Sequence, residues 1–193
     1  MKPTLLLALV LAAISLRAAR AQTTDSNPVA GSRVAVVFTG GYDTNPVDHG
    51  RPVALVAGAL GVPPEVFREA FSRVKPAPAG EAPDPAQVRL NKQALLDTLE
   101  PYGVTNDRLD AVSNYYRYNR SRGEWWRHRR ASAYALVRHG VITGFDIINP
   151  GSGYSSAPQI SVPGYSGVSA TATLTFGPDF AQNGSIKAIK LAN

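Results

Sequence analysis

The chain has 193 residues, 44% of them hydrophobic, and a formal net charge of +6. It contains no cysteine, which excludes disulfide bonds, thiolate catalysis and cysteine–zinc sites. Without Lys2, Arg17 and Arg20, which precede residue 22, the net charge falls to about +3. The remaining basic character is concentrated in residues 117–130, which indicates a local basic surface.

Residues 1–21 are typical of a secretory signal peptide. Lys2 supplies the positive start, residues 5–16 form an apolar run too short to span a bilayer, and Ala19-Arg20-Ala21 predicts cleavage before Gln22. A retained membrane anchor is the alternative. No later segment is long and apolar enough to cross a membrane. We expect a secreted, periplasmic or cell-surface protein, and the lack of disulfides favours a bacterial envelope or extracellular setting.

Residues 22–32 are polar and rich in turn-forming residues, which predicts a flexible lead-in. We expect the following residues, 33–130, to be mainly helical. The apolar, β-branched run at 34–38 predicts a short strand before the first helix. That strand either belongs to the helical region or joins a sheet formed later in the chain.

Four helix starts predict two helix–turn–helix hairpins. The first hairpin begins at Pro52, turns at Gly61 and continues from Pro63. The second begins with Asp84 as the N-cap, turns at Gly103 and continues with Thr105 as the next N-cap. A proline-rich connector at 75–83 separates the two hairpins.

Residues 131–193 predict an antiparallel β-repeat module. Small and apolar residues alternate in 133–137, His139-Gly140 predicts a tight turn, and a strand follows. Residues 184–193 align with 140–149, and each copy is preceded by a predicted strand. The predicted fold class is therefore α+β, with a helical region followed by β-hairpin repeats.

Asn149-Pro-Gly-Ser-Gly-Tyr-Ser-Ser-Ala-Pro158 resembles the GSGY-TSAP β-repeat of exported bacterial proteins and some phage structural proteins. Residues 50–53, 59–71 and 103–118 also resemble segments of a group of uncharacterised exported bacterial proteins. This resemblance implies export and the β-repeat architecture. It implies no catalytic residues.

Asp43, Asp48 and His49 form the first candidate site, in the loop at 39–52. These side chains are suited to binding a divalent cation, or to general-base chemistry by a histidine that an aspartate orients. Their spacing fits no calcium-loop or zinc signature. The structural alternative is that they cap helices, pin turns or pair with Arg51.

The second candidate is the segment 115–130, in which arginines alternate with aromatic residues. Guanidinium groups pair with phosphate, sulfate or carboxylate, and aromatic rings stack on bases or sugars. The alternative is that the aromatic rings pack at a junction while the arginines stay solvated. The candidate polyanion-binding residues are Arg117, Arg120, Arg122, Trp125, Trp126, Arg127, Arg129 and Arg130.

These features predict an exported, non-enzymatic binding or structural protein of the bacterial envelope or extracellular space. Its expected partner is an anionic glycan, a cell-wall polymer or another envelope protein; chromosomal nucleic acid is excluded by export. The alternative is a hydrolase or metal-binding protein that uses the loop at 43–49. We expect no cofactor, with a divalent cation at that loop as the alternative.

Overall fold

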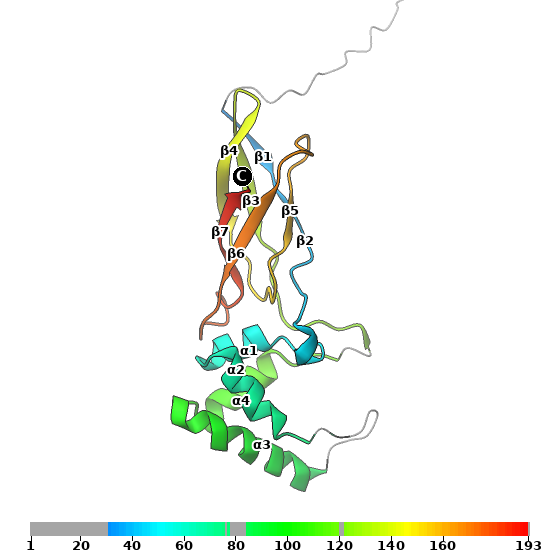
Figure 1. The fold of residues 1–193 in the computed structure, drawn as a ribbon, viewed down its shortest axis with the longest axis vertical. Coiled ribbons are helices and arrows are strands. Elements are labelled where there is room, and N and C mark those ends of the chain that lie inside the picture. Colours follow the sequence, from blue (N-terminus) through cyan, green and yellow to red (C-terminus); the bar gives the residue numbers. More distant parts are fainter. Residues whose placement is uncertain (1–30, 76, 78–83, 120–121, 193) are drawn as a thin grey trace, which may run out of the picture.

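The computed structural model describes residues 31–75, 77, 84–119 and 122–192. The expected signal peptide (1–21) and most of the lead-in (22–32) lie outside these residues. The strands run along the long axis of the molecule, and the helices gather at one end (Figure 1). This arrangement confirms the predicted α+β class. No helix in the described ranges is long and apolar enough to cross a membrane.

The helical part contains the four predicted helices, but only the first predicted hairpin packs as a pair, since the third helix packs mainly on the second and the fourth on the first. Its elements are the 3-10 helix η1 (Pro46–Asp48), the helices α1 (Val53–Leu60), α2 (Pro64–Ser72) and α3 (Pro85–Leu99), the 3-10 helix η2 (Glu100–Tyr102) and α4 (Asn106–Tyr115). Asp84 and Thr105 cap α3 and α4 by accepting hydrogen bonds from the backbone N–H groups of Ala86 and Arg108. Leu55, Leu99 and Val112 are fully buried and form the centre of the helical core.

The β part contains seven strands among the described residues. They are β1 (Ser32–Ala35), β2 (Val37–Thr39), β3 (Ser132–Arg138), β4 (Val141–Asn149), β5 (Gln159–Ser161), β6 (Ala170–Thr175) and β7 (Ser185–Leu191). They pair antiparallel in the orders β1-β3-β4, β2-β5 and β6-β7. Two small cores lie between the sheets, one around Ala135 and Val137 and the other around Tyr154 and Ile186.

Residues 32–39 belong to the β part, although the sequence suggested one mainly helical region over 33–130. β1 pairs with β3, placing Val34 opposite Ala135, and β2 pairs with β5, placing Phe38 opposite Ile160. Burial alternates along β1, as expected for a strand that buries one face. The helices are therefore inserted between β2 and β3, and the alternative in which this segment joins the later sheet is the one observed.

The two predicted repeats form hairpins with the same irregularity. In the first, β3 and β4 place Val137 opposite Ile142, with a shift of register before Val137. In the second, β6 and β7 place Leu174 opposite Ile186, with a shift of register before Leu174. Shifts at equivalent positions indicate that the two copies share backbone geometry as well as sequence.

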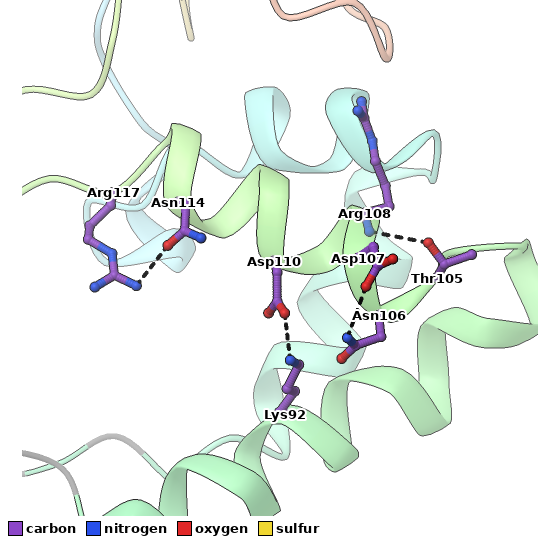
Figure 2. Close-up of polar contacts among 8 residues, drawn as sticks. All are labelled: Lys92, Thr105, Asn106, Asp107, Arg108, Asp110, Asn114 and Arg117. Atoms are coloured by element: carbon purple, nitrogen blue, oxygen red, sulfur yellow. Dashed lines mark hydrogen bonds and ion pairs between the residues drawn. The ribbon is translucent and has the colours of Figure 1, made fainter.

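Arg108 on α4 holds the helical part against the β6–β7 loop. Its guanidinium group donates to the carbonyl oxygens of Ala59, at the end of α1, and Pro178. The same group lies 4.7 Å from the ring centre of Phe180. Figure 2 shows Arg108 pointing away from α3 and Asp110 pointing toward Lys92 of α3. Polar side chains therefore connect α4 to α3 on one side and to α1 and the β6–β7 loop on the other.

Candidate functional site

Asp48 is the most buried of the three candidate loop residues. It is 4% exposed, and both of its carboxylate oxygens accept hydrogen bonds from Arg68, at 2.7 and 3.0 Å. Arg51 lies instead over the ring of Phe71, at 4.2 Å. The expected aspartate–arginine pair thus exists with a different arginine, and it ties η1 to α2.

Asp43 and His49 lie in different surroundings. Asp43 is bound to the loop after β4: its N–H donates to the Ser156 hydroxyl at 3.0 Å, and its carbonyl accepts from Ser155 at 2.7 Å. His49 ends η1 in a left-handed conformation, with φ 50°. A pocket beside Arg68 contains Asp48 and His49, whereas Asp43 lines a separate pocket.

No group of three or more histidine, aspartate or glutamate side chains that could hold a metal ion occurs in the described part of the chain. Asp43 lines a different pocket from Asp48 and His49, so the three residues are not gathered into one site.

The two tryptophans of the arginine–aromatic segment have opposite environments. Trp126 is 1% exposed, belongs to the helical core and donates from Nε1 to the Gly153 carbonyl at 2.8 Å. Trp125 is 58% exposed. Trp126 therefore packs at the junction of the helical and β parts, and Trp125 presents its ring to solvent.

The described arginines of this segment are all exposed. Arg117 donates to the Asn114 amide oxygen at 3.2 Å (Figure 2), Arg127 lies 5.2 Å from the ring centre of Tyr115, and Arg129 donates to the Ala181 carbonyl at 3.3 Å. Arg122 and Arg130 are also exposed. Arg120, another candidate, lies outside the described residues.

A pocket of about 410 Å³ joins parts of both candidate sites. The pocket lies at the junction between the two parts of the fold, since its lining comes from the loop after β2 and from the segment after α4. Its aromatic and acidic lining residues are Tyr42, Asp43, Tyr118, Glu124, Trp125 and Trp126.

The aromatic rings at this pocket are set at steep angles to one another. Trp125 and Trp126 lie at 79° with centres 5.4 Å apart, and Tyr118 and Trp126 have the same angle and separation. Tyr42 is tilted by 47° from Trp125. The Tyr118 hydroxyl donates to the Gly50 carbonyl, which fixes that ring.

Tyr42 connects the pocket to the β part. Its ring stacks on Tyr154 at 12° and 5.4 Å, and it packs against both the helical core and the core around Tyr154. Burial raises the pKa of Tyr42 to about 12; the neighbouring Tyr154 adds to the shift and Arg130 opposes it. The Tyr42 hydroxyl therefore stays protonated at neutral pH.

Tyr42 and Tyr118 are pocket residues that the sequence did not identify. The only local signal for Tyr42 is the preceding pair Gly40-Gly41. A Cβ at Gly41 would lie 2.5 Å from the Tyr154 ring, so only glycine allows the β2 loop to lie against that ring. Tyr118 was part of the aromatic run, but nothing in its spacing separates it from the tyrosines at 115 and 116.

Comparison with family models, curated proteins and solved structures gives no match to this chain. Its function therefore has to be inferred from the geometry and chemistry of its own residues.

Proposed function

We propose that this chain is an exported, non-enzymatic protein of the bacterial envelope or extracellular space. In this proposal it binds an anionic glycan or cell-wall polymer through the arginine–aromatic segment 117–130. Export is supported by the signal-like residues 1–21 and by the resemblance to exported β-repeat proteins.

The observation that carries the proposal is that three of the guanidinium groups in the segment are held in place by neutral partners. Arg117 contacts an amide oxygen, Arg127 contacts a ring and Arg129 contacts a carbonyl. None of these contacts neutralises the positive charge. Exposed arginines whose orientation is fixed but whose charge is not compensated are suited to phosphate, sulfate or carboxylate groups.

The acidic residue within the segment does not form an ion pair with these arginines in the described structure. Glu124 accepts a hydrogen bond from the backbone N–H of Asn119 at 3.0 Å. Trp125, which follows it, is 58% exposed and offers an apolar ring face to a ligand. A sugar ring or another flat or apolar group of the polymer would pack on this face.

Binding of the chain from Gln22 onward to immobilised dextran sulfate and polygalacturonate tests the proposal, with neutral dextran as the reference. We expect binding to both anionic polymers that weakens as the salt concentration rises, because salt screens exposed charges. The triple variant Arg127→Ala, Arg129→Ala, Arg130→Ala should reduce binding at least about tenfold.

The matched control removes the same charge from strands of the β part, in the variant Arg138→Ala, Lys187→Ala, Lys190→Ala. All three of these residues are exposed. An equal loss of binding in both triple variants would show attraction by net charge alone and would refute a defined binding surface at 117–130.

A further inference from the structure

The pocket beside Trp125 differs in charge from the arginines around it. Among the described residues that line it, Asp43 and Glu124 are acidic and none is lysine or arginine. Four of its lining residues carry aromatic rings. Carboxylates combined with aromatic ring faces favour a cation, since the face of a ring carries partial negative charge.

We propose that this pocket binds an alkylated ammonium group, and that the ligand of the protein is therefore zwitterionic. The ammonium group enters the pocket, and an anionic group of the same ligand contacts the nearby arginines. The second half of this inference rests on the proposed function, whereas the first half rests on the pocket alone.

The rings are arranged as adjoining walls. Trp125 and Tyr118 each stand at 79° to Trp126, and Tyr42 is inclined at 70° to Trp126. In these edge-to-face pairs Trp126, which is 1% exposed, supports the other rings from behind, and Trp125, which is 58% exposed, is the ring that a ligand reaches from solvent. A cation at the exposed Trp125 ring would lie in a pocket that Tyr42 and Tyr118 also line.

The two carboxylates are held at the pocket by different contacts. The backbone of Asp43 is bound to Ser155 and Ser156, and its Oδ2 lies 3.4 Å from the Ser156 hydroxyl. Glu124 is held through the backbone N–H of Asn119. Neither contact neutralises the carboxylate charge, so both charges remain to attract a cation.

An alkylated ammonium group fits this lining better than a primary ammonium ion. Its methyl groups are weakly hydrated and pack on tryptophan and tyrosine faces, whereas a primary ammonium must exchange strong water contacts for ring contacts. The volume of about 410 Å³ also leaves room for the group to which the ammonium is attached.

Positive charge for the anionic end of the ligand lies next to the pocket. Arg122 is exposed and directly precedes Gly123, which lines the pocket. Arg130 is exposed and follows two residues after His128, whose ring centre lies 4.7 Å from that of Tyr42. In this proposal, a phosphate or carboxylate a few bonds from the ammonium contacts one of these guanidinium groups.

Calorimetric titration with choline, phosphocholine and 3,3-dimethylbutan-1-ol tests the inference. The alcohol has the shape of choline without its charge. We expect saturable choline binding, at least tenfold weaker binding of the alcohol, and at least threefold tighter binding of phosphocholine than of choline. Equal affinity for choline and the alcohol would overturn the cation site.

Variants locate the site. Asp43→Asn with Glu124→Gln should weaken choline binding at least tenfold, and Trp125→Ala should weaken it similarly because a cation–π contact is lost. Asp97→Asn, which changes an exposed carboxylate on α3, should leave it unchanged. If the double variant binds choline as well as the original chain does, the pocket assignment is wrong.

The same experiments separate this inference from the proposed function. Polyanion binding without choline binding overturns the ammonium pocket and leaves the proposed function standing. Choline binding with no preference for phosphocholine overturns the zwitterionic ligand. Phosphocholine coupled to soluble dextran and vesicles of phosphatidylcholine then distinguish a substituted polymer from a lipid headgroup, since the headgroup chemistry is shared and the carrier differs.

Discussion

The side-chain nitrogen of Asn183 donates a hydrogen bond of 2.7 Å to the hydroxyl oxygen of Tyr116. The same nitrogen donates to the carbonyl oxygen of Leu55 at 2.7 Å, and the side-chain oxygen accepts from the N–H of Gly177 at 3.1 Å. Asn183 is 1% exposed. One buried amide thus links the β6–β7 loop to α1 and to the end of α4, with its donor and acceptor groups both satisfied.

Replacing Asn183 by alanine should lower the free energy of unfolding by about 3 kcal/mol, because several buried polar groups lose their partner at once. Urea denaturation followed by circular dichroism measures this change. Gln182→Ala is the control, since Gln182 is exposed and adjacent; its change should stay within about 0.5 kcal/mol. A loss below about 1 kcal/mol in Asn183→Ala would contradict the linking role.

Gly140 and Gly184 occupy equivalent positions in the two repeats but should respond differently to alanine. Both have positive φ, 77° and 68°, so each substitution strains the backbone by about 1 kcal/mol. A Cβ at Gly140 meets nothing within 4 Å, whereas one at Gly184 would lie 2.5 Å from the Tyr154 carbonyl oxygen. Gly184→Ala should therefore cost at least about 3 kcal/mol in thermal or urea unfolding. Equal costs at the two positions would refute the close contact.

Conservative replacement of the two tryptophans should lower stability at Trp126 and leave it nearly unchanged at Trp125. Trp126→Phe removes a buried hydrogen bond to Gly153 and leaves a void, which should cost about 2 kcal/mol in denaturant unfolding. Trp125→Phe should change stability by less than about 0.5 kcal/mol because the ring is exposed. A stability loss in Trp125→Phe as large as that in Trp126→Phe would mean that both rings are structural.

The Asp48–Arg68 pair should contribute to stability rather than to catalysis. Asp48→Ala removes the partner of an arginine whose side chain is 38% exposed, so water compensates in part and the cost should be about 2 kcal/mol. Asp43→Ala, at an exposed position, should cost less than about 0.5 kcal/mol. Thermal unfolding of the two variants checks this, and no difference between them would contradict the assignment.

Two tyrosines should ionise late in the folded protein. Burial is the main cause that raises the pKa values of Tyr42 and Tyr116 from 10.0 to about 12. The folded state then holds protons that the unfolded state has released. Stability is therefore full below about pH 10 and declines as the pH rises toward about 12. Near-ultraviolet absorbance of tyrosinate follows the ionisation, and Tyr42→Phe and Tyr116→Phe should each remove one late-ionising group.

The four helices were predictable because their signals are local. Asp84 and Thr105 act on N–H groups within three residues of themselves, so the sequence around them is sufficient. The strand at 34–38 was also visible as an apolar run, but its partners were not. Val34 pairs with Ala135 and Phe38 with Ile160, and partner choice between such distant segments depends on the rest of the fold.

The candidate site was predicted in outline and not in detail. Arginine and aromatic residues interleaved in one segment are visible in the sequence, but the opposite burial of Trp125 and Trp126 is not, because an irregular segment has no periodicity to show which side is covered. Asp43 lines this pocket, and hydrogen bonds to Ser155 and Ser156 hold its backbone in place. Asp48 does not line this pocket, and its carboxylate is paired with Arg68, a helix residue twenty positions later in the chain.

The position of the helices between β2 and β3 affects how the chain assembles. The helices pack on one another within residues 53–115, so this part can collapse before the later strands are made. β1 and β2 have to remain unpaired until β3 and β5 are available, with Ser32 finally opposite Val137. Once the helical part has folded, residues 46–115 no longer act as a flexible loop between β2 and β3. The entropy cost of bringing β1 and β2 to their partner strands is then smaller. Mutations in the helical core should therefore slow closure of the sheets, even though they touch no strand.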